Sequence, residues 1–307
     1  MKLKGRFCLG VLLTAFLALA NSLQPASAAD WQKEYPKITM GVITSENEAD
    51  RVKRWKPVRD YLSKELGVLV EERLATDYAG VIEAMKAKKI ELAYFGPASF
   101  SRAWLITNHQ VEPLVAKLNA DGSFGYRSII VVKTDSPYQN IEDLKGKKLA
   151  FADPNSTSGH QAPRYFLHEQ GIDVNDYFGK VEFSGSHENS IVALLNGTFD
   201  AAATWWHSDA DNNPTRMEKK GMIEPGQWRI IWKSPLLPND PWCMPTWLPE
   251  DMRKAVQQAI VEMPEKDPEA FKVLMGTTSE GFKIVTLEEY QPIIRMIQAN
   301  MKDRKSS

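Results

Sequence analysis

A chain of 307 residues has room for about two domains of ordinary size. Hydrophobic residues make up 43% of it, and 38 basic against 39 acidic residues leave a net charge of −1. The near-neutral balance excludes the basic footprint of a nucleic-acid-binding protein, and no run of like charge marks an interaction tail.

The N-terminus has the features of a secretory signal peptide. Its first six residues carry three positive charges and no negative one. An apolar stretch follows at 7–20, and Ala26-Ser27-Ala28 then provides a cleavage site of small residues. The stretch is shorter than the ~20 apolar residues that span a bilayer. We therefore expect secretion with cleavage near Ala28.

Apolar runs that alternate with amphipathic segments predict strands and helices in the first part of the chain. The predicted strands are 38–43, 68–72 and 91–95, and the predicted helices are 51–66 and 78–88. In the first helix, Trp55, Val58 and Leu62 recur at helical spacing. Such alternation indicates an α/β fold with a mainly parallel sheet covered by helices.

The alternation begins again after Arg127. It predicts strands at 128–133, 148–152, 199–204 and 228–232, helices at 141–146, 161–170 and 189–195, and a mostly helical segment from Pro249. We predict one lobe of residues 29–130 and 235–307, and a second lobe, 131–234, inserted into it. Two crossings between lobes form a hinge, and the cleft between lobes is the expected ligand site.

A turn rich in hydroxyl groups separates one predicted strand from the next helix. Its sequence at 153–159 is Asp-Pro-Asn-Ser-Thr-Ser-Gly. The first N–H groups of a helix lack partners and carry the positive end of the helix dipole. With the hydroxyls of Ser156, Thr157 and Ser158, they can surround a tetrahedral anion. Serine and threonine are also ordinary helix caps, so both interpretations stay open.

His187 lies just before another predicted helix. Its imidazole could donate to an oxyanion, or it could be a capping or surface histidine. No His-x-x-x-His or cysteine-rich pattern predicts a metal site. No Gly-x-x-x-x-Gly-Lys-Ser/Thr pattern predicts nucleotide hydrolysis. We expect no metal and no cofactor.

Four segments in order resemble the phosphonate-binding proteins of the PhnD type. They are 77–85, 153–159, 185–188 and 231–241, and the resemblance covers nearly the whole mature chain. It implies a type II periplasmic binding protein fold, in which two lobes with mixed, mainly parallel sheets are joined by two hinge strands. It also implies a periplasmic protein without enzymatic activity, whose partner is an ABC permease in the inner membrane.

The resemblance implies a set of ligand-binding residues on both lobes. The hydroxyl turn and the histidine carry over to Ser156, Thr157, Ser158 and His187, and the facing residues carry over to Tyr78, Tyr126 and Asp240. A carboxylate at Asp240 would repel a fully ionised phosphonate. It is compatible with a ligand that offers a protonated P–OH, or a cation, to the carboxylate.

One stretch departs from the family pattern. Relatives that bind aminoethylphosphonate are implied to place a second acid near the ligand amine, but 203–208 reads Ala-Thr-Trp-Trp-His-Ser. Methylphosphonate or phosphite is therefore favoured. The possible pocket wall comprises Tyr94, Trp205, Trp206 and His207, although the tryptophans could equally fill the interior of the lobe.

The sequence leaves two other functions open. One is a binding protein for phosphate, a sulfonate or another small anion. The other is a secreted phosphoesterase with Ser156 or Thr157 as nucleophile and His187 as base. Against the enzyme, the chain has no Gly-x-Ser-x-Gly elbow at this turn and no set of metal ligands.

Overall fold

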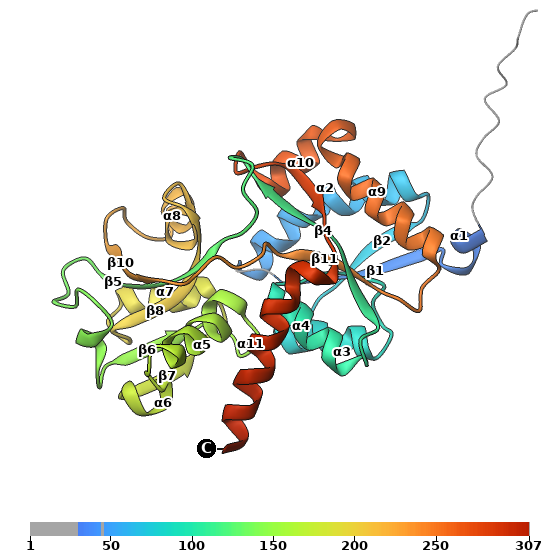
Figure 1. The fold of residues 1–307 in the computed structure, drawn as a ribbon. Coiled ribbons are helices and arrows are strands. Elements are labelled where there is room, and N and C mark those ends of the chain that lie inside the picture. Colours follow the sequence, from blue (N-terminus) through green and yellow to red (C-terminus); the bar gives the residue numbers. More distant parts are fainter. Residues whose placement is uncertain (1–29, 44–45, 307) are drawn as a thin grey trace, which may run out of the picture.

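The computed structural model describes residues 30–43 and 46–306. The predicted signal peptide, 1–28, lies outside the described residues. Two lobes lie side by side, each built on a six-stranded sheet with helices around it (Figure 1). Within the described ranges, no helix combines the length and the apolar character needed to cross a membrane.

The first lobe has the sheet order β12-β4-β11-β3-β1-β2. Its strands are β1 Lys37–Val42, β2 Leu69–Arg73, β3 Leu92–Tyr94, β4 Val111–Asn119, β11 Pro241–Pro245 and β12 Ser279–Ile284. Its helices are α1 Asp30–Glu34, α2 Glu48–Leu66, α3 Tyr78–Lys86, α4 Pro97–Ile106, α9 Glu250–Lys266, α10 Pro268–Met275 and α11 Leu287–Ser306. Strands β2, β1 and β3 run parallel, whereas β11, β4 and β12 join antiparallel.

The second lobe has the sheet order β10-β5-β8-β6-β7, with β9 paired to β8. Its strands are β5 Arg127–Lys133, β6 Lys148–Phe151, β7 Lys180–Phe183, β8 Ala201–Ser208, β9 Asp211–Asn212 and β10 Trp228–Lys233. Its helices are the 3₁₀-helix η1 Glu142–Leu144, the π-helix η2 Thr157–Gln161, α5 Ala162–Glu169, α6 Val174–Tyr177, α7 His187–Leu195 and α8 Asn213–Lys219. Strands β7, β6 and β8 run parallel, and β5 and β10 complete the sheet antiparallel.

The predicted α/β class with mixed sheets is confirmed. The predicted helices at 51–66 and 78–88 correspond to α2 and α3 within a few residues, and β12 interrupts the predicted helical C-terminus. The chain crosses between lobes twice, after β4 and after β10. Tyr126 and Leu237 exchange two backbone hydrogen bonds, of 2.9 and 2.8 Å, so the two crossing segments run side by side. The predicted lobe boundary at 130 falls inside β5.

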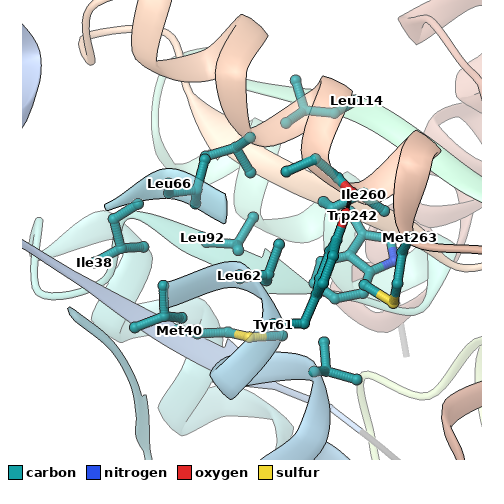
Figure 2. Close-up of a cluster of buried hydrophobic side chains, with 14 of the residues drawn as sticks. Ile38, Met40, Tyr61, Leu62, Leu66, Leu92, Leu114, Trp242, Ile260 and Met263 are labelled. Atoms are coloured by element: carbon teal, nitrogen blue, oxygen red, sulfur yellow. Dashed lines mark hydrogen bonds between the residues drawn. The ribbon is translucent and has the colours of Figure 1, made fainter. Parts of the chain in front are cut away.

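A buried cluster holds the first lobe together between α2, α9 and the sheet (Figure 2). Trp55, Val58 and Leu62 of α2 are fully buried, as their helical spacing predicts. Trp55 packs against Trp242 of the central strand β11, with ring centroids 5.3 Å apart. Full burial of such side chains contributes about 1.5–3 kcal/mol each to the stability of the fold. This cluster therefore holds α2 and α9 firmly against the sheet.

A second apolar cluster joins the two lobes. It contains Ala98 of α4, Ala162 of α5, Trp205 of β8, and Ile293 and Ile297 of α11. The C-terminal helix α11 therefore contacts α4 of the first lobe and α5 of the second (Figure 1). Buried Asn300 at its end donates to the backbone oxygen of Gln161 at 3.0 Å and to the side-chain oxygen at 2.7 Å.

Candidate ligand-binding site

A cavity of about 100 Å³ lies between the two lobes. It is small beside the about 300–1,000 Å³ of pockets that take drug-sized ligands. All but one of the residues predicted from the sequence line it: Tyr78, Tyr94, Tyr126, Ser156, Thr157, Ser158, His187, Trp205, His207 and Asp240. The first lobe and its crossing segments supply the tyrosines and the aspartate, and the second lobe supplies the others.

Four helices begin at this cavity. Tyr78, Thr157 and His187 are the first residues of α3, η2 and α7, and Gly96 caps α4. The unpaired N–H groups and the dipole of a helix make its start a favourable place for an anion. Because these starts come from both lobes, negative charge in the cavity is attracted by both.

The hydroxyl turn is held in place by its own hydrogen bonds. Ser156 caps the π-helix by accepting from the N–H of Gly159 at 3.0 Å. Ser128 of β5 donates to the carbonyl of Ser158 at 2.6 Å. The phenol groups of Tyr78 and Tyr126 line the cavity together with these three hydroxyl residues. The turn therefore presents its hydroxyls in a fixed arrangement.

Gly159 allows this turn to pack against the end of β6. A Cβ atom at this position would lie 2.6 Å from Cβ of Ala152 and 2.8 Å from both Cε1 of His187 and Oγ of Ser156. These distances are shorter than any ordinary carbon contact. The absence of a side chain is thus what brings the histidine and the serine together.

His187 lies between two hydroxyl groups. Its Nε2 is 3.1 Å from Oγ of Ser156, and its Nδ1 is 3.0 Å from Oγ1 of Thr204 on β8. Burial lowers the pKa of His187 to about 3. The ring is therefore neutral at pH 7, and it serves as a hydrogen-bond donor or acceptor without adding charge.

Asp240 lies at the end of the second crossing segment and faces the cavity. Burial raises the pKa of its carboxyl to about 7, although Lys117 and Arg216 act in the opposite direction. The carboxyl is therefore close to half-protonated at neutral pH. In one state it accepts a hydrogen bond from an acidic ligand, and in the other it donates one to an ionised oxygen.

Trp206 does not line the cavity. Adjacent residues of a strand point to opposite faces of the sheet, so Trp205 and Trp206 of β8 face different ways. The indole N–H of Trp206 donates to Asp209 at 3.2 Å, and Nζ of Lys233 lies 3.8 Å from the ring centroid. Trp205 instead packs under the guanidinium of Arg216 at 4.6 Å.

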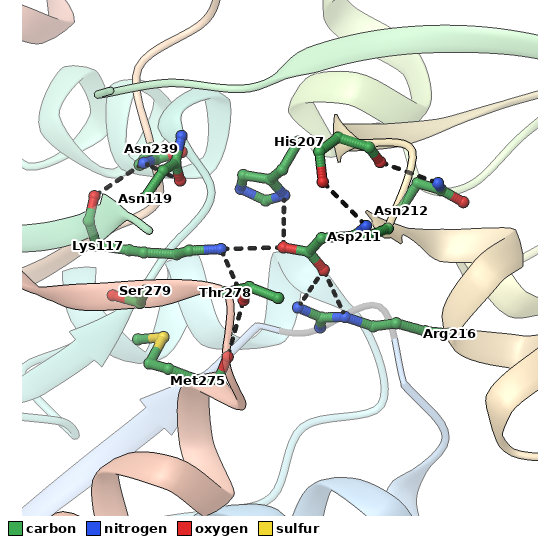
Figure 3. A network of polar contacts seen from close by, with 12 residues as sticks. Lys117, Asn119, His207, Asp211, Asn212, Arg216, Asn239, Met275, Thr278 and Ser279 are labelled. Atoms are coloured by element: carbon green, nitrogen blue, oxygen red, sulfur yellow. Dashed lines mark hydrogen bonds and ion pairs between the residues drawn. The ribbon is translucent and has the colours of Figure 1, made fainter. Parts of the chain in front are cut away.

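The sequence did not reveal the cations of the site or Asn239. Arg54, Lys117, Arg216 and Asn239 line the cavity together with apolar residues of α2 and α10. Lys117 and Arg216 meet at Asp211, next to His207 (Figure 3). The one available signal was Lys117, a charged residue at a buried position in the mostly apolar strand β4.

Direct contacts join the lobes around the cavity. The backbone N–H of Ala98 in α4 donates to Oγ1 of Thr157 at 2.9 Å, and the hydroxyl of Ser99 donates to the carbonyl of Asn155 at 3.0 Å. Lys220, which follows the end of α8, pairs with Asp50 of α2 at 2.8 Å. The two lobes are therefore in direct contact, and both contribute to one site between them.

Two lobes, two crossings and an enclosed interlobe cavity define a periplasmic binding protein. Comparison with solved structures supports this class. The binding protein component of an ABC phosphonate transporter from Pseudomonas aeruginosa is 25% identical, with a TM-score of 0.74 over 85% of each chain. PhnD1 of Prochlorococcus marinus in complex with methylphosphonate is 24% identical, with a TM-score of 0.71 over 87% of this chain and 99% of that one.

The family is shown by sequence. The family model for the periplasmic phosphonate substrate-binding protein of ABC transporters matches residues 40–290. The phosphonates-binding periplasmic protein of Escherichia coli K12 is 33% identical over 78% of this chain and 69% of its own length. The phosphate-import protein PhnD of Mycolicibacterium smegmatis is 33% identical over 73% and 71%. The chain belongs to this family, whose members are substrate-binding components of transporters and not enzymes.

Proposed function

We propose that this protein captures a small phosphorus oxyanion in the periplasm and delivers it to an ABC permease in the inner membrane. The supporting observation is the hydroxyl turn at 156–158, which begins one helix, lines the cavity and is hydrogen-bonded directly to the start of α4. The names of relatives include phosphonate, phosphate and phosphite as ligands. What these ligands share is a tetrahedral phosphorus oxyanion, which suits such a site.

Capture needs no chemical step. In an open form the hydroxyl turn faces water, and a bound oxyanion then bridges Ser156 and Thr157 of one lobe to Tyr78 of the other. Charge-assisted hydrogen bonds are strong in a site that excludes water. The ligand makes these contacts to both lobes only when they close, so its binding shifts the population towards the closed form that the permease recognises.

Within this class, methylphosphonate or phosphite is the preferred ligand over aminoethylphosphonate. The cavity wall carries the cations Lys117 and Arg216 rather than an additional acid at 203–208. An ammonium group would be repelled there. Asp240, with a pKa of about 7, suits a ligand that retains one P–OH proton near neutral pH. A sulfonate has no such proton to share.

The geometry argues against the phosphoesterase alternative. Ser156 and His187 are within hydrogen-bond distance, but the third member of the set is the hydroxyl of Thr204 rather than a carboxylate. A histidine whose pKa is about 3 is a weak base for deprotonating a serine. The same residues are well suited to holding an anion without reacting with it.

The test is calorimetry of the mature protein with methylphosphonate and phosphite. The double variant Ser156→Ala with Thr157→Ala removes two charge-assisted hydrogen bonds and should weaken binding by about 2–4 kcal/mol. Thr134→Ala removes an exposed hydroxyl of the same lobe and serves as the control. Unchanged affinity in the double variant would refute the assigned turn, and turnover of phosphate esters would refute a pure binding role.

A further inference from the structure

The wall of the cavity away from the hydroxyl turn is positively charged. Lys117 of β4 and Arg216 of α8 both line the cavity, and both pair with the single carboxylate Asp211 (Figure 3). Asp211 lies behind them and is not among the cavity-lining residues that the structure describes. Two cations therefore face the cavity from opposite lobes and share one negative charge.

The hydrogen bonds of the two cations leave capacity on the cavity side. Nε and Nη2 of Arg216 lie 3.0 and 2.9 Å from Oδ1 of Asp211, and Nη1 has no hydrogen-bond partner in the described part of the chain. Nζ of Lys117 bonds Oδ2 of Asp211 and the hydroxyl of Thr278, each at 3.1 Å, and an ammonium has three donors. Each cation therefore has an N–H left for a ligand.

His207 adds no charge beside this pair, whereas Asp240 is a second acidic group that acts on both cations. Burial lowers the pKa of His207 to about 3, so this ring beside Asp211 is neutral. Burial also lowers the pKa of Lys117 and of Arg216, which means that a further negative charge nearby would stabilise their charged forms. The third cation of the wall, Arg54, already pairs with Glu46 at 2.7 Å and donates to the carbonyl of Leu274 at 2.8 Å.

Asp240 shows where the two cations lie relative to the hydroxyl turn. A Cβ atom at Gly96 would lie 3.1 Å from Oγ1 of Thr157 and 3.8 Å from Oδ1 of Asp240, so the Asp240 carboxyl lies beside the hydroxyl turn. The same carboxyl interacts electrostatically with Lys117 and Arg216. A ligand with its phosphorus group at the turn would direct its other end towards the cations.

We propose that Lys117 and Arg216 receive a second acidic group of the ligand, so that among phosphonates with a larger substituent the site prefers one that carries a carboxylate one or two carbons from phosphorus. This inference rests on the proposed function, because it assumes that the phosphorus end occupies the hydroxyl turn. It specifies which substituent the site accepts beyond methylphosphonate and phosphite, and it gives the cations a role that those small ligands leave unused.

The experiment is calorimetry at pH 7.5 with three ligands of similar size: phosphonoacetate, ethylphosphonate and 2-aminoethylphosphonate. A charge-assisted hydrogen bond implies that phosphonoacetate binds about 10–100-fold more tightly than ethylphosphonate. Aminoethylphosphonate should bind more weakly than both. Equal affinities for phosphonoacetate and ethylphosphonate would overturn the inference and leave the proposed function standing. Failure of every phosphorus ligand, methylphosphonate included, would overturn both.

The variant Arg216→Gln tests the assigned residue. In this variant the ratio of phosphonoacetate to ethylphosphonate affinity should fall to about one, whereas Lys219→Gln, which removes an exposed cation from the same helix, should keep the wild-type ratio. Thermal unfolding checks that the variant is folded. If Arg216→Gln is not folded, Arg216→Lys is measured instead and should keep most of the preference for phosphonoacetate. A wild-type ratio in folded Arg216→Gln, or loss of the preference in Arg216→Lys, would overturn the assignment.

Discussion

The substitution Gly159→Ala tests how tightly the hydroxyl turn is packed. The new Cβ would lie 2.6 Å from Cβ of Ala152, an atom fixed to the strand β6 that cannot rotate away. Carbon atoms normally approach to about 3.5–4 Å, so turn and strand must separate by about 1 Å. Overpacking of this kind costs about 1–3 kcal/mol. Since the same Cβ would lie 2.8 Å from His187 and Ser156, the shift must also disturb the site.

Thermal unfolding and calorimetry with methylphosphonate measure the two effects. In a chain of this size we expect a fall in Tm of about 2–5 °C, together with weaker ligand binding. Gly80→Ala in α3 is the matched control, because Gly80 is exposed and its nearest contact, Cβ of Ala75, is 3.2 Å away. Wild-type Tm and wild-type affinity in Gly159→Ala would refute the close packing on which the site depends.

Two further predictions concern charge and the C-terminal helix. Burial raises the pKa of Asp240 from 3.8 to about 7, so the unfolded chain releases this proton at a lower pH than the folded protein does. The free energy of unfolding should therefore fall by up to about 4 kcal/mol as pH rises from about 4 to 7. The free energy of unfolding of Asp240→Asn should not show this fall. Buried His187 and His207 act in the opposite direction in both proteins, so the measurement is the difference in unfolding free energy between wild type and variant at each pH. Parallel pH profiles would contradict the assignment. Asn300→Ala removes both hydrogen bonds to Gln161 and should cost about 1–3 kcal/mol in urea unfolding, whereas exposed Gln298→Ala should cost little; an equal cost in both would show that the bonds do not matter.

The strands and helices that could be predicted are those with a simple apolar pattern. The sequence did not reveal β4 or β11 as strands. Pro113 and Lys117 interrupt the apolar run of β4, and Pro241 and Pro245 bound β11. Proline lacks the N–H that a central strand needs, so these segments read as loops. Here β11 is nevertheless central, between β4 and β3, because its prolines stand at its two ends.

In the candidate site, too, the sequence predicts residues that are neighbours in the chain better than residues that meet only in the fold. The hydroxyl turn is one continuous segment with helix-start chemistry, and it was therefore visible in the sequence. Lys117 and Arg216 come from different lobes and meet only when the lobes close on Asp211. No periodicity or spacing links residues that approach each other in this way. Sequence patterns thus located the hydroxyl turn but not the pair of cations.

Because α11 rests on α4 of one lobe and α5 of the other, it restrains the motion that admits the ligand. An opening that preserved its contacts would pivot near this helix and separate the lobes most at the opposite rim, where Lys220 meets Asp50. The ion pair at that rim would then have to break before ligand could enter. A pair of spin labels placed on α2 and α8 would report the swing, while a pair placed on α11 and α5 would stay at a nearly constant separation.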